Sequence, residues 1–154
     1  MNDRSRGYFY VAIQFLLIAL LFTAPRQPEP YGAISEPLSF LGIAVIAAGA
    51  IVLAISFFRL GRSLTANPVP KEDGELVTTG LYSRVRHPIY FGLLVMAVGV
   101  VLDAGWWPQV IIALMLYLLL NIKAQFEESL LLKKYPDYKK YMLATPRFFP
   151  RIGK

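Results

Sequence analysis

Long, uninterrupted apolar segments dominate the chain. Four of them stand out, Tyr8–Ala24, Leu38–Leu60, Ile89–Leu102 and Trp106–Ile122, with 17, 23, 14 and 17 residues. Their apolar residues do not recur at the spacing of a single helix face, so the helices that they form are expected to be apolar all round. At about 1.5 Å per residue, the first, second and fourth suffice for a hydrocarbon core about 30 Å thick. The pattern predicts an all-α, polytopic membrane protein with four transmembrane helices.

The third segment is too short to cross a bilayer unaided. It either extends back through His87 and Pro88 or forms a tight hairpin with the fourth segment that only just reaches the far side. Residues 103–105 are the expected turn of that hairpin. Trp106 and Trp107 follow it, where an aromatic belt is expected at a membrane interface.

The first apolar segment shares some features with a signal peptide, because basic residues precede it and small residues end it. Pro25 comes directly after Ala24 and disfavours cleavage there, so we expect a retained helix. Gln14 is the one strongly polar side chain within it. We therefore expect residues 1–154 to form a single integral membrane domain that ends in a short C-terminal helix.

The composition agrees with a membrane location. Apolar residues make up 56% of the chain and charged residues 17%, whereas soluble domains carry about 45–50% and about 25%. The chain has no cysteine, which excludes disulfides, thiolate metal sites and a cysteine nucleophile. Its net charge of +6 comes from basic residues that flank the apolar segments. This placement favours a membrane surface, and no nucleic acid is expected as a partner.

The distribution of lysine and arginine predicts the topology. Most of these residues lie at the amino terminus, in the 61–86 loop and in the tail after Ile122, whereas Pro25–Pro37 holds only Arg26. Loops rich in lysine and arginine stay in the cytoplasm. We therefore expect both termini and the 61–86 loop to be cytoplasmic. The short chain and the lack of sorting signals favour a prokaryotic inner membrane.

Unusual polar residues gather in two of these cytoplasmic segments, and the first contains the only histidine, His87, between Arg86 and Pro88. Proline fits the first turn of a helix. The free N–H groups after it, together with the helix dipole and Arg86, make a place for an anion such as a carboxylate or phosphate. A lone histidine at a membrane interface is equally often structural. Because no second histidine or cysteine is present, we expect no metal site.

Two adjacent glutamates, Glu127 and Glu128, follow the fourth apolar segment on its expected helical continuation. The simpler interpretation is that both are solvated residues beyond the membrane. Lys123 lies four residues before Glu127, so the two can pair on one helix face. The more specific interpretation is that a carboxylate here faces a pocket shared with Tyr82 and Tyr90. Aromatic rings and a carboxylate suit a bound cation such as a sulfonium.

Several short motifs together carry a family resemblance. They are Leu76–Tyr82, Arg86–Gly92, the glutamate pair, Tyr135–Tyr141 and Thr145–Pro150. Their order and spacing resemble the isoprenylcysteine carboxyl methyltransferase family, which is related to phospholipid N-methyltransferases. The resemblance covers residues 57–150, the expected catalytic core, and it implies an integral membrane methyltransferase that uses S-adenosylmethionine.

The resemblance also implies which residues bind the cofactor. These are Asn67, Gly74, Glu75, Leu76, Val77, Tyr82, His87, Pro88, Ile89, Tyr90, Glu127 and Glu128. The 74–77 segment would act largely through its backbone, and either member of the glutamate pair can supply the carboxylate.

The sequence does not identify the molecule that accepts the methyl group. Eukaryotic prenylcysteine enzymes place an arginine four residues before the key glutamate, where this chain has Lys123. Lysine keeps the charge but loses the two-pronged geometry of a guanidinium. By this resemblance, Lys123 and Glu127 are the candidate catalytic residues. The expected acceptor is lipophilic: a prenylcysteine-like carboxylate, a membrane lipid, or a small thiol or amine.

Two other classes of protein compete with this interpretation. A non-catalytic membrane subunit that keeps the methyltransferase fold is the main alternative, and it predicts no cofactor binding. A transporter or channel is disfavoured, because no charged residue lies in the middle of an apolar segment to mark a pathway.

Overall fold

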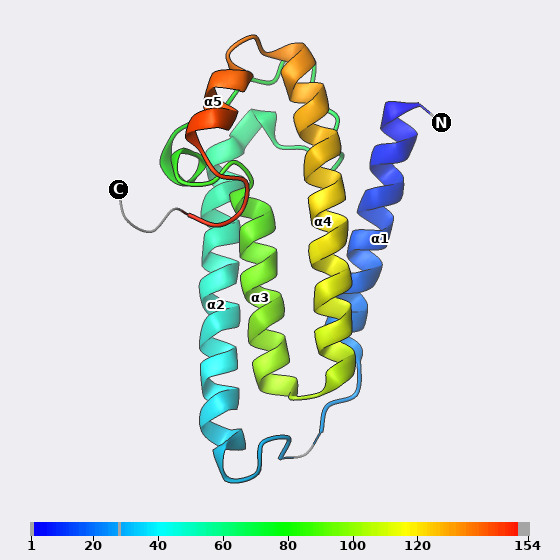
Figure 1. The fold of residues 1–154 in the computed structure, drawn as a ribbon, viewed down its shortest axis with the longest axis vertical. Helices are drawn as coiled ribbons and strands as arrows, with labels where there is room; N and C mark the ends of the chain where they lie inside the picture. The colour runs from blue at the N-terminus through cyan, green and yellow to red at the C-terminus, as the bar shows by residue number, and fades with distance from the viewer. Residues whose placement is uncertain (1, 28, 151–154) are drawn as a thin grey trace.

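The structure is a computed structural model that describes residues 2–27 and 29–150, and these residues form helices joined by loops (Figure 1). The α-helices are α1 (Asp3–Thr23), α2 (Ser35–Leu60), α3 (Pro88–Ala104), α4 (Trp107–Lys134) and α5 (Tyr138–Ala144). Short 3-10 turns lie at Gly32–Ile34 (η1), Gly61–Ser63 (η2) and Gly80–Ser83 (η3). The described ranges contain no strand, so the all-α prediction is confirmed.

Three of the helices, α1, α2 and α4, are long and apolar enough to cross a membrane. The third predicted segment forms α3, an apolar helix of 17 residues that falls just short of that length. It begins at Pro88, with His87 as its cap, so it does extend back beyond the apolar run. The fourth segment continues as one helix to Lys134 and carries both glutamates. The fold is that of a polytopic, all-α membrane protein.

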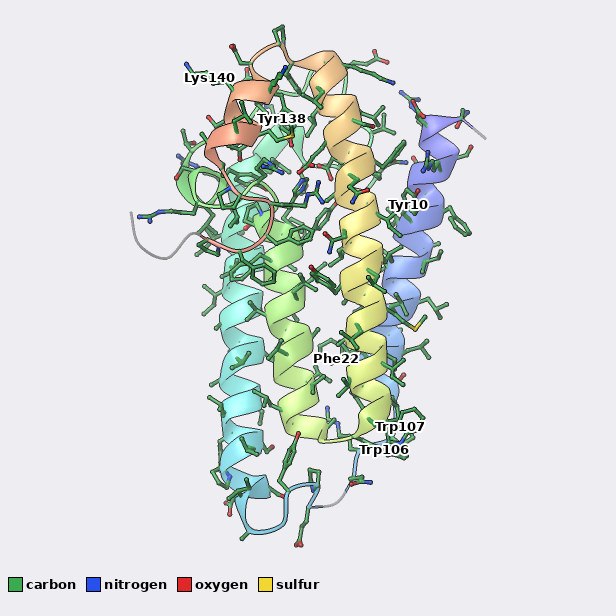
Figure 2. The ribbon with its side chains drawn as sticks, viewed as in Figure 1. Tyr10, Phe22, Trp106, Trp107, Tyr138 and Lys140 are labelled. Carbon is green, nitrogen blue, oxygen red and sulfur yellow. The ribbon has the colours of Figure 1, made fainter. Side chains whose placement is uncertain are left out.

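The polar segments gather at one end of the bundle. Figure 1 shows the start of α1, the long loop between α2 and α3, the end of α4, and α5 all at that end. Figure 2 shows Trp106 and Trp107 at the opposite end from Tyr138. The basic segments that were expected to share one side of the membrane therefore do share one end of the fold.

The opposite end is closed by polar contacts among the ends of α2, α3 and α4 and the segment that follows α1. The Asp103 carboxylate accepts hydrogen bonds from Arg26 and from Ser39, the latter at 2.5 Å. Gln109 at the start of α4 is buried, and its side-chain nitrogen donates to the Pro25 carbonyl at 2.8 Å. The turn is shorter than expected, because α3 continues to Ala104 and ends at Gly105, whose φ of 60° is left-handed. A left-handed residue after the last turn is a common way to end a helix, and glycine adopts it without strain.

Helices α2 and α3 approach each other closely along facing glycines. A Cβ on Gly42 would lie 2.7 Å from the Gly99 carbonyl oxygen, and a Cβ on Gly99 would lie 2.6 Å from that of Gly42. Gly49 and Gly92 face each other in the same way one heptad along, with 2.7 and 2.9 Å. In lipid, helices associate by close packing rather than by hydrophobic exclusion, so these glycines allow the contact.

Replacing Gly99 with valine is expected to destabilise the α2–α3 pair. The new Cβ would meet backbone atoms of Gly42 and Ile46 at 2.6 and 2.8 Å, so the helices must separate. Overpacking of this kind typically costs about 1–3 kcal/mol. The midpoint of thermal unfolding in detergent measures the loss. Val98→Leu is the matched control, because Val98 is exposed on the outer face of the same helix. An unchanged midpoint for Gly99→Val would contradict the close packing.

Candidate active site

Two aromatic residues at the start of α3 form one wall of the site. The rings of His87 and Tyr90 stack in parallel, with centroids 5.1 Å apart. Phe148 from the C-terminal segment packs edge-on against both rings, at 6.0 and 6.2 Å. Pro88 supplies the first helical position between them, so the helix start itself fixes the orientation of both side chains.

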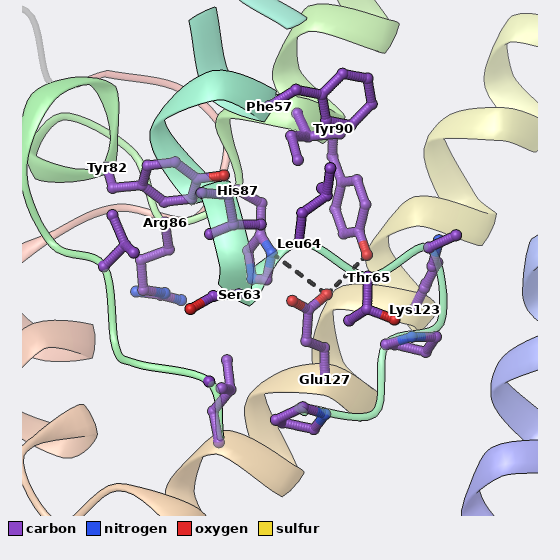
Figure 3. Close-up of a pocket in the computed structure, with 18 of the residues that line it drawn as sticks. Phe57, Ser63, Leu64, Thr65, Tyr82, Arg86, His87, Tyr90, Lys123 and Glu127 are labelled. Carbon is purple, nitrogen blue, oxygen red and sulfur yellow. Dashed lines mark hydrogen bonds and ion pairs between the residues drawn. The ribbon is translucent and has the colours of Figure 1, made fainter. Parts of the chain in front are cut away.

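Glu127 reaches this aromatic pair from α4 (Figure 3). The Tyr90 hydroxyl donates to Glu127 Oε2 at 2.7 Å, and His87 Nδ1 lies 3.8 Å from the same oxygen. The Glu127 side chain keeps 27% of its surface exposed, and it lines a cavity. A carboxylate that is held beside aromatic rings and open to a cavity is suited to attract a cation.

Glu128, the next residue, has the opposite environment. It is 4% exposed. Its Oε1 accepts from Arg86 Nη2 at 2.8 Å and lies 3.1 Å from His87 Nε2, and its Oε2 accepts from Arg147 Nη2 at 2.7 Å. Glu128 therefore holds three basic side chains together and does not line the cavity.

Arg86 ties the C-terminal segment to the start of α3. Its Nη1 donates to the carbonyl oxygens of Met142 and Thr145 at 2.7 and 2.5 Å, and its backbone N–H donates to the Pro146 carbonyl at 2.9 Å. The sequence predicted an anion beside Arg86 at this helix start. In the structure Glu128 provides that anion, so these Arg86 bonds are made within the protein.

Lys123 has a partner that the sequence did not predict. Its Nζ donates to Gln14 Oε1 of α1 at 2.7 Å and lies 5.2 Å from the centre of the Tyr90 ring. Lys123 is 3% exposed. The pairing of Lys123 with Glu127 that their spacing allows does not occur in the described part of the chain, where neither residue has the other as an ion-pair partner.

The loop between α2 and α3 is held over the site by contacts to its backbone. Ser63 Oγ accepts from the Glu75 N–H at 2.9 Å and donates to the Glu75 carbonyl at 3.1 Å. The Tyr135 hydroxyl donates to the Gly74 carbonyl at 2.5 Å, and the Lys134 ammonium donates to the Lys71 carbonyl. These contacts anchor the 71–75 part of the loop to η2 and to the end of α4.

Two buried tyrosines, Tyr82 and Tyr138, and the half-buried Tyr141 form another wall. The Tyr141 hydroxyl donates to the Tyr82 carbonyl at 2.5 Å, and the Tyr82 hydroxyl reaches the Ser56 carbonyl at 3.4 Å. Burial raises the pKa of Tyr141 to about 12, although Arg86 acts in the opposite direction. Burial raises the pKa of Tyr82 and of Tyr138 further. All three therefore stay neutral near pH 7 and present aromatic surface and hydroxyl groups rather than charge.

These walls enclose a cavity of about 520 Å³. This volume lies within the range of about 300–1,000 Å³ that is typical of sites for small molecules and cofactors. One part of the cavity is polar, with Glu127, Lys123 and the backbone of the 74–77 segment. The other part is apolar and is formed by α1 and α2. Its side chains are Val11, Phe15, Ile18, Leu53, Phe57 and Leu60.

The structure brings most of the predicted residues to this cavity. Those that line it are Gly74, Glu75, Leu76, Val77, Tyr82, His87, Ile89, Tyr90, Lys123 and Glu127. Asn67, Pro88 and Glu128 do not. Asn67 instead joins the loop to α1, because its side chain donates to the Arg4 carbonyl at 3.0 Å and accepts from the Val69 N–H at 3.0 Å. Whether any of these residues contacts a cofactor stays a prediction.

Sequence reasoning left out several lining residues. Gln14, Ser63, Tyr135, Tyr138 and Tyr141 all border the cavity. Gln14 had a visible signal as the polar exception in an apolar segment. The tyrosines belong to a motif of the family resemblance, but the motif alone does not show that they face a cavity.

Comparison with known proteins identifies the class. The family model for phospholipid methyltransferases matches residues 38–138, which include most of α2, all of α3 and α4, and the loop over the site. The chain therefore belongs to the phospholipid methyltransferase family, the family of isoprenylcysteine carboxyl methyltransferase-like proteins. This confirms the family resemblance drawn from the motifs.

Two curated relatives extend the similarity over nearly the whole chain. The nickel-cobalt-cadmium resistance protein NccN of Alcaligenes xylosoxydans xylosoxydans is 30% identical over 149 residues, covering 96% of this chain and 65% of NccN. The cobalt-zinc-cadmium resistance protein CzcN of Cupriavidus metallidurans is 28% identical over 149 residues, covering 96% of this chain and 64% of CzcN. The chain thus spans just under two thirds of the length of these relatives. Within its described residues, no group of three or more histidine, cysteine or acidic side chains is placed to hold a metal ion.

Proposed function

We propose that this protein is an S-adenosylmethionine-dependent methyltransferase that acts on a lipophilic acceptor at the membrane surface. One observation carries the proposal: a single cavity joins a partly exposed carboxylate among aromatic rings to an apolar region between transmembrane helices. Methyltransferases of this family generally use S-adenosylmethionine. Bound here, that cofactor would supply an electrophilic methyl group on a sulfonium.

The residues present fit that cofactor. Glu127 offers a negative charge to a sulfonium, and the Tyr90 and Tyr82 rings offer aromatic faces that also attract cations. The 74–77 backbone, anchored by Tyr135, lies along the same cavity and can bind the polar parts of a nucleoside. Along the chain, the 74–77 segment, Tyr82, Tyr90 and Glu127 come in the same order as the family motifs that contain them.

The apolar region suits the acceptor. Helix α2 packs mainly on α3 and α1 mainly on α4, yet both α1 and α2 contribute side chains to the cavity. Figure 1 shows them on opposite sides of the bundle. An acceptor with a hydrocarbon portion can therefore reach the polar groups from the lipid side. Lys123 lies where the polar and apolar regions meet, and it would orient the polar head of the acceptor.

Catalysis by these residues rests on positioning and on exclusion of water. Aligning two reactants within a closed cavity can supply a large share of the rate enhancement. A carboxylate acceptor needs no base. A thiol or amine acceptor must lose a proton, and Glu127 or His87 is placed to accept it.

The excess of lysine and arginine at the site end supports a cytoplasmic location for that end, and with it for both termini. We further propose a prokaryotic inner membrane and a single integral membrane domain with its catalytic core at 57–150. Membrane lipids are then the surrounding partners.

The alternative is a non-catalytic membrane subunit, since the curated relatives are named for metal resistance rather than for an activity. Calorimetric titration of the purified protein with S-adenosylmethionine and S-adenosylhomocysteine separates the two. Saturable binding supports the enzyme, and turnover can then be screened with lipid, prenylcysteine, thiol and amine acceptors. A folded protein that binds neither compound in detergent or in nanodiscs would overturn the proposal. Glu36→Gln, at an exposed site on the far end of α2, is the control variant, and it should bind both compounds as the wild type does.

Tyr90→Phe is expected to weaken S-adenosylmethionine binding about tenfold, because hydrogen bonds to charged groups contribute about 1.5–3 kcal/mol. The substitution keeps the ring and removes only the hydroxyl that positions Glu127. The same titration measures the effect. Tyr117→Phe is the matched control, since Tyr117 lies on α4 outside the cavity. Equal affinities for Tyr90→Phe and the wild type would show that this hydroxyl does not position the carboxylate.

A further inference from the structure

Two opposite charges line the cavity without forming an ion pair with each other. Lys123 and Glu127 stand four residues apart on α4, and both side chains border the same space. Such residues are neighbours on a helix surface and commonly pair. Here Glu127 is bonded to Tyr90, and Lys123 is bonded to a different helix.

The separation is unexpected on energetic grounds. Lys123 is almost completely buried, and a buried ammonium without a carboxylate partner is costly. Attraction between opposite charges also strengthens as the local dielectric constant falls, so a direct ion pair would gain more here than at a surface. Some contact must therefore hold Lys123 away from Glu127.

Gln14 provides that contact. It lies on α1, it is buried, and its Oε1 accepts a hydrogen bond from Lys123 Nζ at 2.7 Å. It is also the polar exception in the first apolar segment. Gln14 lies outside residues 38–138, the region that the family model matches. The shared motifs of the family therefore do not account for it.

We propose that Gln14 is a positioning residue that prevents Lys123 from neutralising Glu127. This inference rests on the proposed function, because its purpose is to leave Glu127 available for a sulfonium. It also leaves the Lys123 ammonium at the boundary between the polar and apolar regions, where an acceptor head group would lie. A neutral amide suits this task, because it holds the ammonium without adding a second negative charge.

The consequence is a specific pattern of affinities. In Gln14→Met, Lys123 loses its partner and is expected to turn to Glu127. The Glu127 charge is then partly cancelled, so affinity for the cationic S-adenosylmethionine should fall about tenfold, which corresponds to about 1.4 kcal/mol. Affinity for S-adenosylhomocysteine, which has no sulfonium, should fall much less. A general loss of structure would instead lower the affinities for both compounds to the same extent.

Removing the lysine as well provides the decisive comparison. In Gln14→Met with Lys123→Met, no ammonium remains to compete for Glu127, so S-adenosylmethionine affinity should return to that of Lys123→Met alone. Gln14→Glu keeps an acceptor for the ammonium and should bind within about threefold of the wild type, a difference below 1.4 kcal/mol. These variants are compared by calorimetric titration of the whole protein with both compounds.

Three results would overturn the inference. The first is an unchanged S-adenosylmethionine affinity in Gln14→Met. The second is an equal loss for both compounds. The third is a double variant no better than Gln14→Met, which would indicate a purely structural role. If Gln14→Met does not fold, binding by Gln14→Glu still decides, because weak binding there contradicts the proposal. A wild-type protein that fails to bind either compound would instead reject the proposed function itself.

Discussion

Replacing Glu128 with glutamine is expected to lower the free energy of unfolding by about 3–5 kcal/mol, the usual cost of removing one partner from a buried ion pair. The Glu128 carboxylate holds Arg86, His87 and Arg147 through bonds of 2.7–3.2 Å. Without its charge, Arg86 would remain buried with no carboxylate partner, and only neutral oxygens would accept its hydrogen bonds. The C-terminal segment, which Arg86 fastens to α3, should then loosen together with Phe148.

The midpoint of thermal unfolding in detergent tests this expectation, and limited proteolysis of the C-terminal segment reports the loosening directly. Glu127→Gln is a closely matched control, since it makes the same chemical change one residue earlier. Because Glu127 is partly exposed and bonded mainly to one hydroxyl, its replacement should leave the midpoint nearly unchanged. Equal midpoints for the two variants would show that the Glu128 cluster does not hold the segment in place.

The helices could be predicted from the sequence because lipid imposes a simple requirement. Each spanning segment must satisfy its own backbone hydrogen bonds and present apolar side chains outward, so the helix appears as an uninterrupted apolar run. The start of α3 was also visible, because proline favours the first helical turn. The close packing of α2 on α3 was not predicted. Which glycines face each other depends on how the helices align in space.

The sequence could not predict that Glu127 lines the cavity while Glu128 binds the basic side chains of the C-terminal cluster. Consecutive residues on a helix point about 100° apart, since one turn contains about 3.6 residues. One of the pair therefore faces the cavity while the other faces the C-terminal segment. The motif places both in the sequence, but only the position of the neighbouring elements shows which is which.

The partner of Lys123 was hidden for a related reason. Its spacing from Glu127 indicated a helix-face pair, and this local rule was overridden by a residue far away in the sequence. Gln14 was conspicuous as a polar residue in an apolar segment. Its distance from Lys123, however, depends on the packing of α1 against α4, which no local pattern encodes.

Glu127→Gln is expected to raise the KM for S-adenosylmethionine about a hundredfold, equivalent to about 3 kcal/mol, while kcat stays the same or rises. The reason lies in the chemistry of methyl transfer. Positive charge on the sulfur disappears as the methyl group leaves, so a carboxylate beside it stabilises the bound cofactor more than the transition state. Its loss therefore weakens binding without a matching loss in the chemical step.

Comparing the effects of Glu127→Gln on kcat and on KM also shows whether Glu127 acts as a base toward the acceptor. If it removes a proton from the acceptor, kcat falls together with kcat/KM, because the loss then occurs in the transition state. A thiol or amine acceptor would give this result, whereas a carboxylate acceptor would not, since it carries no proton to remove. Steady-state kinetics with varied S-adenosylmethionine at saturating acceptor distinguish these cases. If kcat and KM are both unchanged in Glu127→Gln, the partly exposed Glu127 carboxylate does not contact the cofactor, and the proposed role of Glu127 is wrong.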